Sequence, residues 1–154
     1  MFFIHILEIE VTPLLFKKGT AKLALYGMSS VKDERLHRLF REDCVKMLVP
    51  AEDTDGWFNL LVLHQNRAYR SRPTNYIPDH FLPELMDLVL WGHEHDCRIE
   101  PERVIHGDDK DFFITQPGSS VGKHISKFIH KILILDYCFP KQLKMPWRVE
   151  TFYI

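Results

Sequence analysis

Two short apolar runs that each end in histidine constrain the fold of this chain most strongly. Residues 57–63 lead directly into His64. Residues 86–91 lead, after one glycine, into His93 and His95. Each run has the length and the branched or aromatic content of a buried strand. In open sheets flanked by helices, ligands bind beyond the carboxyl ends of the strands. We therefore expect the three histidines to gather at one edge of a sheet, where they could bind a metal ion.

Composition places the chain among soluble globular proteins. Its 154 residues can bury one core, and 45% of them are hydrophobic and 27% charged. The formal net charge of -1 gives no overall attraction to nucleic acid or to an anionic membrane, so any such surface has to be local. No run approaches the roughly 20 apolar residues that span a bilayer. Cys44, Cys97 and Cys138 are few, odd in number and widely spaced, which favours a reducing compartment. We expect a soluble intracellular protein.

Further strands are predicted by hydrophobic patterning. Residues 14–16 and 21–26 flank a short turn that contains glycine, which is typical of a β-hairpin. Residues 112–115 and 131–136 each read as a strand. Residues 1–10 alternate weakly and could form another. The excess of strands over helices favours an α/β or α+β sheet protein.

Helices are fewer. Residues 32–43 carry apolar side chains at helical spacing behind an acidic first turn, which predicts an amphipathic helix. Residues 44–49 either continue that helix or form a short strand. Residues 79–86 predict a short helical piece that Pro83 kinks or restarts. Residues 101–111 predict a charged turn region.

The histidines are suited to metal binding because neutral imidazole is a good ligand for Mn, Fe and Zn ions. Side chains at i and i+2 of an extended segment point the same way, so His93 and His95 can face one ion or two neighbouring ions, with Glu94 turned aside. Gly92 allows the backbone to approach the site closely. His64 adds a third ligand if the two strands are neighbours. Any one of these histidines alone is more simply a polar cap at a strand end, and three imidazoles also match a zinc site of the hydratase kind.

Carboxylates that could complete a two-metal site are missing from the sequence. It contains no Asp-x-His and no Gly-Asn-His motif. Asp87 lies inside an apolar run, Asp33 lies on the predicted helix, and Asp96 is expected to face solvent. Because paired-metal hydrolases use bridging carboxylates, the histidines represent half of a metal centre.

A concentrated basic and aromatic stretch follows the first histidine-ending strand. It contains Arg67, Arg70 and Arg72, with Tyr69 and Tyr76 between and beyond them. The arginines could contact DNA phosphates through the bidentate geometry of the guanidinium group. The alternative is a solvated loop, and the sequence favours neither.

Four motifs together resemble those of Mre-eleven-type DNA double-strand-break repair nucleases, which belong to the calcineurin-like metallophosphoesterases. The motifs are HQNR at 64–67, NYIP at 75–78, LVLWGHEHDC at 88–97 and ITQPGSSV at 114–121. The resemblance divides the chain into three parts. These are an N-terminal segment of undefined structure at 1–10, the second half of a metallophosphoesterase domain at 11–137, and an irregular tail at 138–154.

The resemblance implies a partial metallophosphoesterase β-sandwich flanked by helices, with a two-manganese site. His64 and His93 would bind one ion, and His95 the other. It implies a manganese-dependent three-prime to five-prime exonuclease and endonuclease of double-strand break repair and meiosis, located in the nucleus. The implied partners are DNA, an SMC-like ATPase subunit, nibrin and a second copy of the nuclease, with no membrane involved.

The upstream ligands of that family are absent from this chain, so the polypeptide alone is expected to bind at most one weakly held manganese ion and to be inactive. One alternative is a non-enzymatic truncated product or partner-binding module of the same ancestry. Another is an unrelated three-histidine zinc protein.

Overall fold

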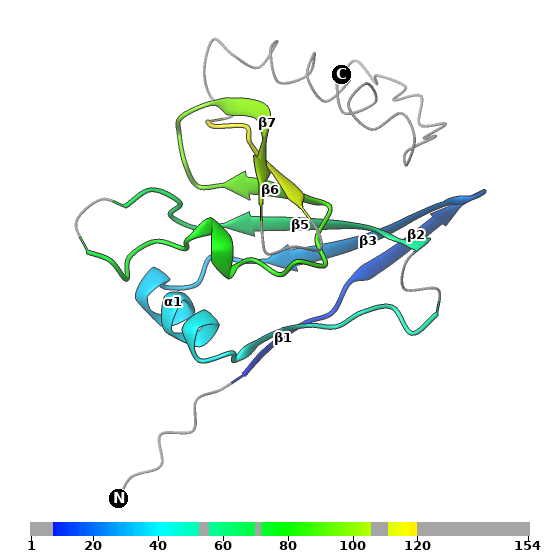
Figure 1. Ribbon diagram of the computed structural model, residues 1–154, viewed down its shortest axis with the longest axis horizontal. Coiled ribbons are helices and arrows are strands. Elements are labelled where there is room, and N and C mark those ends of the chain that lie inside the picture. The colour runs from blue at the N-terminus through cyan, green and yellow to red at the C-terminus, as the bar shows by residue number, and fades with distance from the viewer. Residues whose placement is uncertain (1–7, 53–55, 70–71, 106–110, 120–154) are drawn as a thin grey trace, which may run out of the picture.

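A computed structural model describes residues 8–52, 56–69, 72–105 and 111–119 of the chain. A six-stranded mixed sheet with the order β2-β3-β5-β6-β8-β7 forms its centre (Figure 1). The strands are β2 (Leu14–Lys18), β3 (Ala21–Met28), β5 (Phe58–His64), β6 (Leu88–Gly92), β7 (Arg98–Val104) and β8 (Phe112–Gln116). A two-stranded parallel sheet pairs β1 (Ile9–Val11) with β4 (Val45–Met47). The helical elements are α1 (Asp33–Arg41) and the 3-10 turn η2 (Asp79–Phe81).

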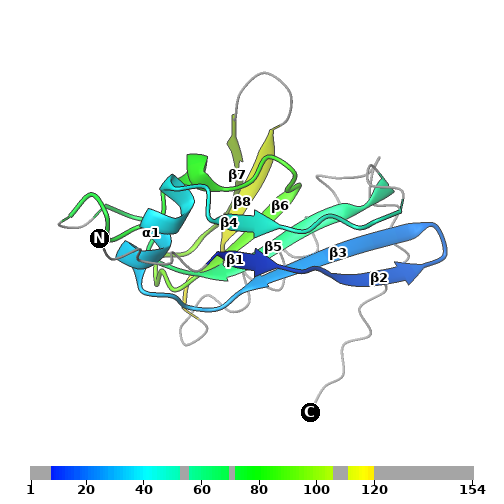
Figure 2. The same cartoon turned by 90° about the horizontal axis from the view of Figure 1, so that it is seen from below.

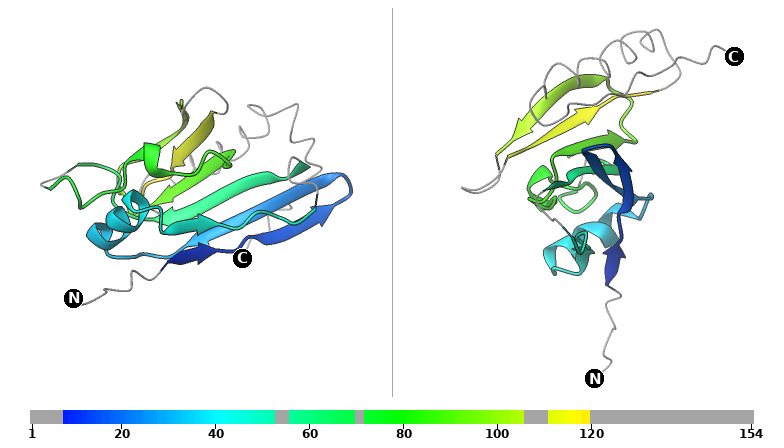
Figure 3. Two further views of the ribbon diagram at one scale, coloured as in Figure 1. Left: turned by 60° about the horizontal axis from the view of Figure 1, so that its bottom comes forward. Right: turned by 90° about the vertical axis from the view of Figure 1, so that its right-hand side faces the viewer.

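The predicted hairpin is confirmed at one edge of the large sheet. Strands β2 and β3 pair antiparallel, with Lys18 opposite Ala21, and Gly19 occupies the turn with φ of 59°. A positive φ is strained for most residues but not for glycine. Figure 3 shows this hairpin at one end of the sheet and β7 and β8 at the other.

The two histidine-ending runs form β5 and β6, the central strands of the sheet. Strands β3, β5, β6 and β8 run parallel to one another, so their carboxyl ends lie at one edge. Buried side chains alternate along β5 and the second half of β3, as expected for a strand with one buried face, whereas β6 and β8 also bury consecutive residues. Tyr26, Leu61 and Val89 lie side by side in register and are fully buried on one face.

The small sheet covers this buried face. Val11 of β1 belongs to the same core cluster as Tyr26, and Val45 and Met47 of β4 pack against the cluster. The Tyr26 hydroxyl donates a hydrogen bond to the Leu48 carbonyl oxygen at 3.1 Å. Figure 2 shows β1 and β4 in front of the large sheet. The opposite face is apolar but only half-buried; it carries Leu23, Leu25, Leu60, Val62, Leu90 and Phe113.

The amphipathic helix is also confirmed. Helix α1 buries Leu36 and Leu39 and lies beside the carboxyl ends of β3 and β5 (Figure 1). It ends where Asp43 adopts a φ of 54° and Cys44 donates its N–H to the Leu39 carbonyl oxygen. The chain therefore turns into β4, so the segment 44–49 contains a short strand and does not continue the helix.

Two predicted elements are corrected. The region 101–111 was expected to be a turn, but β7 runs through its first part as an edge strand antiparallel to β8. Edge strands accept charged residues and proline, and the register shifts between Arg98 and Glu102, where Pro101 lies. The helical piece at 79–86 is only the turn η2, because Leu82 is extended before Pro83.

The α/β class expected from the sequence is confirmed by this mixed sheet with few helices. The predicted strand at 131–136 and the tail at 138–154 lie outside the described residues. Within the described part of the chain, no helix is long and apolar enough to cross a membrane.

Candidate metal centre

The carboxyl ends of β5 and β6 bring two of the predicted histidines together. The strands are parallel neighbours, and His64 pairs with Gly92 in the register. The Nε2 atom of His64 lies 3.2 Å from the Nδ1 atom of His93, and the two rings meet edge to face with centroids 4.9 Å apart. Both side chains are exposed. The two strands are therefore neighbours, as the prediction of a shared site requires.

Gly92 makes this approach possible. A Cβ atom at this position would lie 3.0 Å from Nδ1 of His64 and 3.2 Å from the Leu63 carbonyl oxygen. Contacts this short force a neighbour to move, so any larger residue would displace the His64 ring. The close backbone approach expected of this glycine is what the structure contains.

His93 adopts a backbone conformation that is uncommon for residues other than glycine, with φ of 79°. Such conformations cost free energy and persist where the surrounding structure enforces them. After it, Glu94 is buried and His95 is exposed. His93 and His95 thus face solvent, while Glu94 is turned inward.

His95 does not join the pair. Among the residues that the structure describes, no three His, Cys, Asp or Glu side chains come together in a way that could hold a metal ion. The backbone oxygen of His95 accepts a hydrogen bond from the Ser119 N–H at 3.3 Å. The structure therefore brings His64 and His93 together but does not bring His95 to the same point.

The histidine pair has the geometry of two ligands on one ion. Two imidazole nitrogens bound to the same ion at roughly 2.1 Å, with angles between octahedral and tetrahedral, lie roughly 3.0–3.4 Å apart. The observed 3.2 Å falls in that range. The same separation suits a hydrogen bond in which one neutral ring donates its N–H to the other. The residues therefore fit a metal as part of its ligand set.

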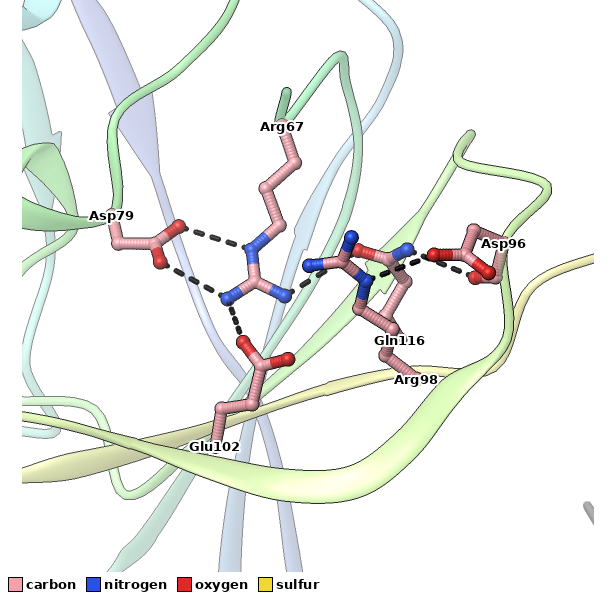
Figure 4. A network of polar contacts seen from close by, with 6 residues as sticks. All are labelled: Arg67, Asp79, Asp96, Arg98, Glu102 and Gln116. Carbon is pink, nitrogen blue, oxygen red and sulfur yellow. Dashed lines mark hydrogen bonds and ion pairs between the residues drawn. The ribbon is translucent and has the colours of Figure 1, made fainter. Parts of the chain in front are cut away.

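Arg67, one of the three arginines that could contact DNA, forms ion pairs with side chains of its own chain (Figure 4). Its guanidinium forms a two-point ion pair with Asp79, at 3.1 and 3.0 Å, and a second ion pair with Glu102 at 2.6 Å. It also lies over the Trp91 ring, and its side chain is 11% exposed. Burial would lower the pKa of Arg67, but its hydrogen bonds to these carboxylates outweigh burial and raise it. This engagement argues against a contact with phosphate.

The charges around Arg67 also disfavour the binding of a phosphate. A cavity of about 590 Å³ opens beside it. The charged residues that line the cavity are the acidic Asp79, Glu94, Asp96 and Glu102 and the basic Arg67 and Arg98. Carboxylates outnumber guanidinium groups, so the cavity disfavours a phosphate. Of the other predicted arginines, Arg72 is exposed, and Arg70 lies outside the described residues.

Two carboxylates bond to backbone groups of the β5 region in ways that the sequence did not reveal, Asp33 beyond its carboxyl end and Asp87 near its start. The Asp33 carboxylate accepts hydrogen bonds from the backbone N–H of Asn66, at 3.2 Å, and from its side-chain amide, at 2.7 Å. The Asp87 carboxylate accepts the Asn59 N–H at 2.7 Å. Asp33 lies far from Asn66 in the sequence and looks like an ordinary acid in a first helical turn. No local pattern reveals such pairings.

The sequence of the chain was compared with protein families and with curated proteins. No protein-family model matches the chain. The chain is 49% identical over 154 residues to double-strand break repair protein MRE11 of Mus musculus, and 49% identical over 119 residues to that of Homo sapiens. It is 44% identical over 136 residues to MRE11 of Arabidopsis thaliana. The alignments cover 96%, 77% and 82% of this chain but 21%, 16% and 18% of the relatives. The chain thus spans about a fifth of the length of the curated relatives it matches.

Proposed function

The chain is related in sequence to one segment of MRE11-type double-strand break repair proteins, and on this premise we propose that it carries part of the metal centre of a manganese-dependent DNA nuclease. The observation that carries the proposal is the 3.2 Å separation of the His64 and His93 ring nitrogens at the ends of neighbouring strands. The strained backbone of His93 supports it, because such strain clusters at functional sites.

In this proposal His64 and His93 hold one manganese ion, and His95 binds a second. When bound, the ions supply Lewis-acid polarisation of the phosphodiester and a water molecule of lowered pKa. The chain itself holds the histidine ligands in position. Strands β5 and β6 fix the depth of each histidine through their register, and Gly92 leaves the space in which the His64 ring lies.

We further propose a reaction, partners and DNA contacts for this site. The reaction is exonuclease and endonuclease cleavage of DNA in double-strand break repair, in the nucleus. The partners are an SMC-like ATPase subunit, nibrin and a second copy of the nuclease. Arg72, which is exposed, and Arg70 are the arginines that we propose to contact DNA phosphate. The ion pairs of Arg67 make it the poorest candidate of the three.

By itself, this polypeptide is proposed to bind at most one ion weakly and to leave DNA uncut. Neutral imidazoles cannot offset the repulsion between two divalent ions, which is the role of a bridging carboxylate. A second candidate function, as a non-enzymatic partner-binding module, is favoured by the exposed apolar side chains of Leu14, Leu15 and Phe16 on the edge strand β2.

Calorimetric titration of the chain with Mn²⁺ tests the proposal. Wild-type protein should bind one ion, and His93→Ala should bind none, because it removes one of the paired nitrogens. His80→Ala, which removes an exposed histidine from η2, is the matched control and should bind as wild type does.

Unchanged binding by His93→Ala, or no binding by the wild type, contradicts the proposed site. A cleavage assay on duplex DNA with Mn²⁺ accompanies the titration. Cleavage by the purified chain that His93→Ala abolishes would overturn the proposal that the polypeptide alone is inactive.

A further inference from the structure

We propose that Glu94 is a positioning residue, whose buried carboxylate holds together the two chain segments that carry His64 and His93. This inference rests on the proposed function of the histidine pair as metal ligands. Glu94 follows β6 and sits between two exposed histidines, yet its own side chain is only 7% exposed.

The Glu94 carboxylate is satisfied by the backbone of the other histidine segment. Its Oε1 atom accepts the Arg67 N–H at 2.8 Å and the Ala68 N–H at 3.2 Å. A carboxylate taken out of water needs such partners, and bonds to an ionised acceptor are stronger than neutral ones. The contact therefore links the segment after β6 to the segment after β5 at a point where no strand pairing joins them.

A second contact links the same segments just before His93. The indole Nε1 of Trp91 donates a hydrogen bond to the Gln65 carbonyl oxygen at 2.8 Å, and both side chains are buried. His93 is thus bracketed by two links to the chain that follows His64, one from Trp91 and one from Glu94. Together they fix the relative position of the two backbones from which the imidazoles project.

The link from Glu94 also bears on the conformation of His93. A φ of 79° is unfavourable for histidine and needs enforcement by its neighbours. Glu94 is the next residue, and its side chain is anchored to another segment. Release of that anchor allows His93 to relax toward ordinary backbone angles, which moves its ring away from His64.

The test uses the 154-residue chain and three variants. Glu94→Ala removes the acceptor, and Glu94→Gln keeps one side-chain oxygen that can accept both N–H groups. Asp96→Ala is the control, since it deletes an exposed carboxylate from the same segment with the same change of charge. One readout is Co²⁺ affinity from the visible absorption of the bound ion. The other is the nuclear Overhauser effect between the His64 and His93 rings in metal-free protein.

We expect Glu94→Ala to weaken Co²⁺ binding roughly 10-fold or more, as loss of an outer supporting partner does in other metal sites. It should also lose the ring-to-ring Overhauser effect. Glu94→Gln should restore both readouts, and Asp96→Ala should leave both unchanged. If Glu94→Ala does not fold, as judged by circular dichroism, Glu94→Met replaces it, because it keeps the side-chain length without an acceptor.

Retention of both readouts by Glu94→Ala overturns the inference, and so does a Glu94→Gln variant as impaired as Glu94→Ala. Failure of the proposed function looks different. In that case the wild type binds no Co²⁺, while the Overhauser effect of the metal-free chain still reports whether Glu94 positions the two rings.

Discussion

Single residues decide whether the two imidazoles can meet. The register of β5 and β6 places His64 directly beside Gly92, and the ring lies where a side chain at position 92 would go. Alanine in place of glycine usually stabilises a protein slightly, by reducing the entropy of the unfolded chain. At position 92 the steric contacts oppose that gain.

Gly92→Ala is therefore expected to lower the free energy of unfolding by about 1 kcal/mol, at the low end of the cost of overpacking, because the exposed His64 ring can move aside. It should also weaken Mn²⁺ binding by moving the His64 ring. Urea unfolding and metal titration measure the two effects.

Gly27→Ala is the matched control, since this glycine also lies in a strand and a Cβ there would meet nothing within 4 Å. It should be neutral or stabilising by about 0.5 kcal/mol. An equal response of the two variants would show that the contact between position 92 and His64 does not matter.

The role of a single residue could be predicted from the sequence where only one residue type fits the available space or backbone angle. The glycine before His93 and the glycine of the β2–β3 turn were both identified for that reason. Sequence reasoning failed for Glu94 and Asp33, because each is bonded to a backbone N–H group 27 or 33 positions away. Those distances are set by the sheet order, which a single sequence does not contain.

At the scale of elements, Arg67 joins parts of the chain that no strand pairing connects. Its ion pairs reach Asp79 in η2 and Glu102 in β7, and its guanidinium covers Trp91 at the end of β6. The sequence placed this arginine in a loop after a strand and allowed a contact with DNA. Position alone could not show that two carboxylates from later elements converge on it.

Arg67→Ala is expected to lower the free energy of unfolding by about 2 kcal/mol, through lost hydrogen bonds to charged groups and two carboxylates left without a counter-charge. The expected loss of unfolding free energy is moderate because both carboxylates are partly exposed to solvent. Urea unfolding measures it.

The comparison variant is Arg98→Ala. It removes an ion pair with Asp96 in which both side chains are more than half exposed, so its cost should stay below about 0.5 kcal/mol. Similar losses from the two variants would contradict the structural role given to Arg67.

At the scale of the whole molecule, the fold was predicted best where the hydrophobic pattern was clean. Helix α1 follows from helical spacing, the hairpin from two apolar runs around a glycine turn, and β5, β6 and β8 from short apolar runs of strand length. Strand β7 was missed because its charges and Pro101 look like a loop, and only pairing with β8 makes it a strand. The apolar face of the large sheet is only half-buried, so a second sheet could pack against it. This agrees with the expectation of a partial sandwich.

The most direct test of the account is a site-resolved Mn²⁺ titration, followed in the imidazole nuclear magnetic resonance spectrum of the chain. Paramagnetic broadening should begin at His64 and His93 together, since their nitrogens lie 3.2 Å apart and share one ion. The signals of His37 and His80, near the α1–η2 contact, should stay sharp at the same metal concentration. Broadening of all histidines alike, or of His64 without His93, would contradict the claim that these two strand ends form part of a metal centre.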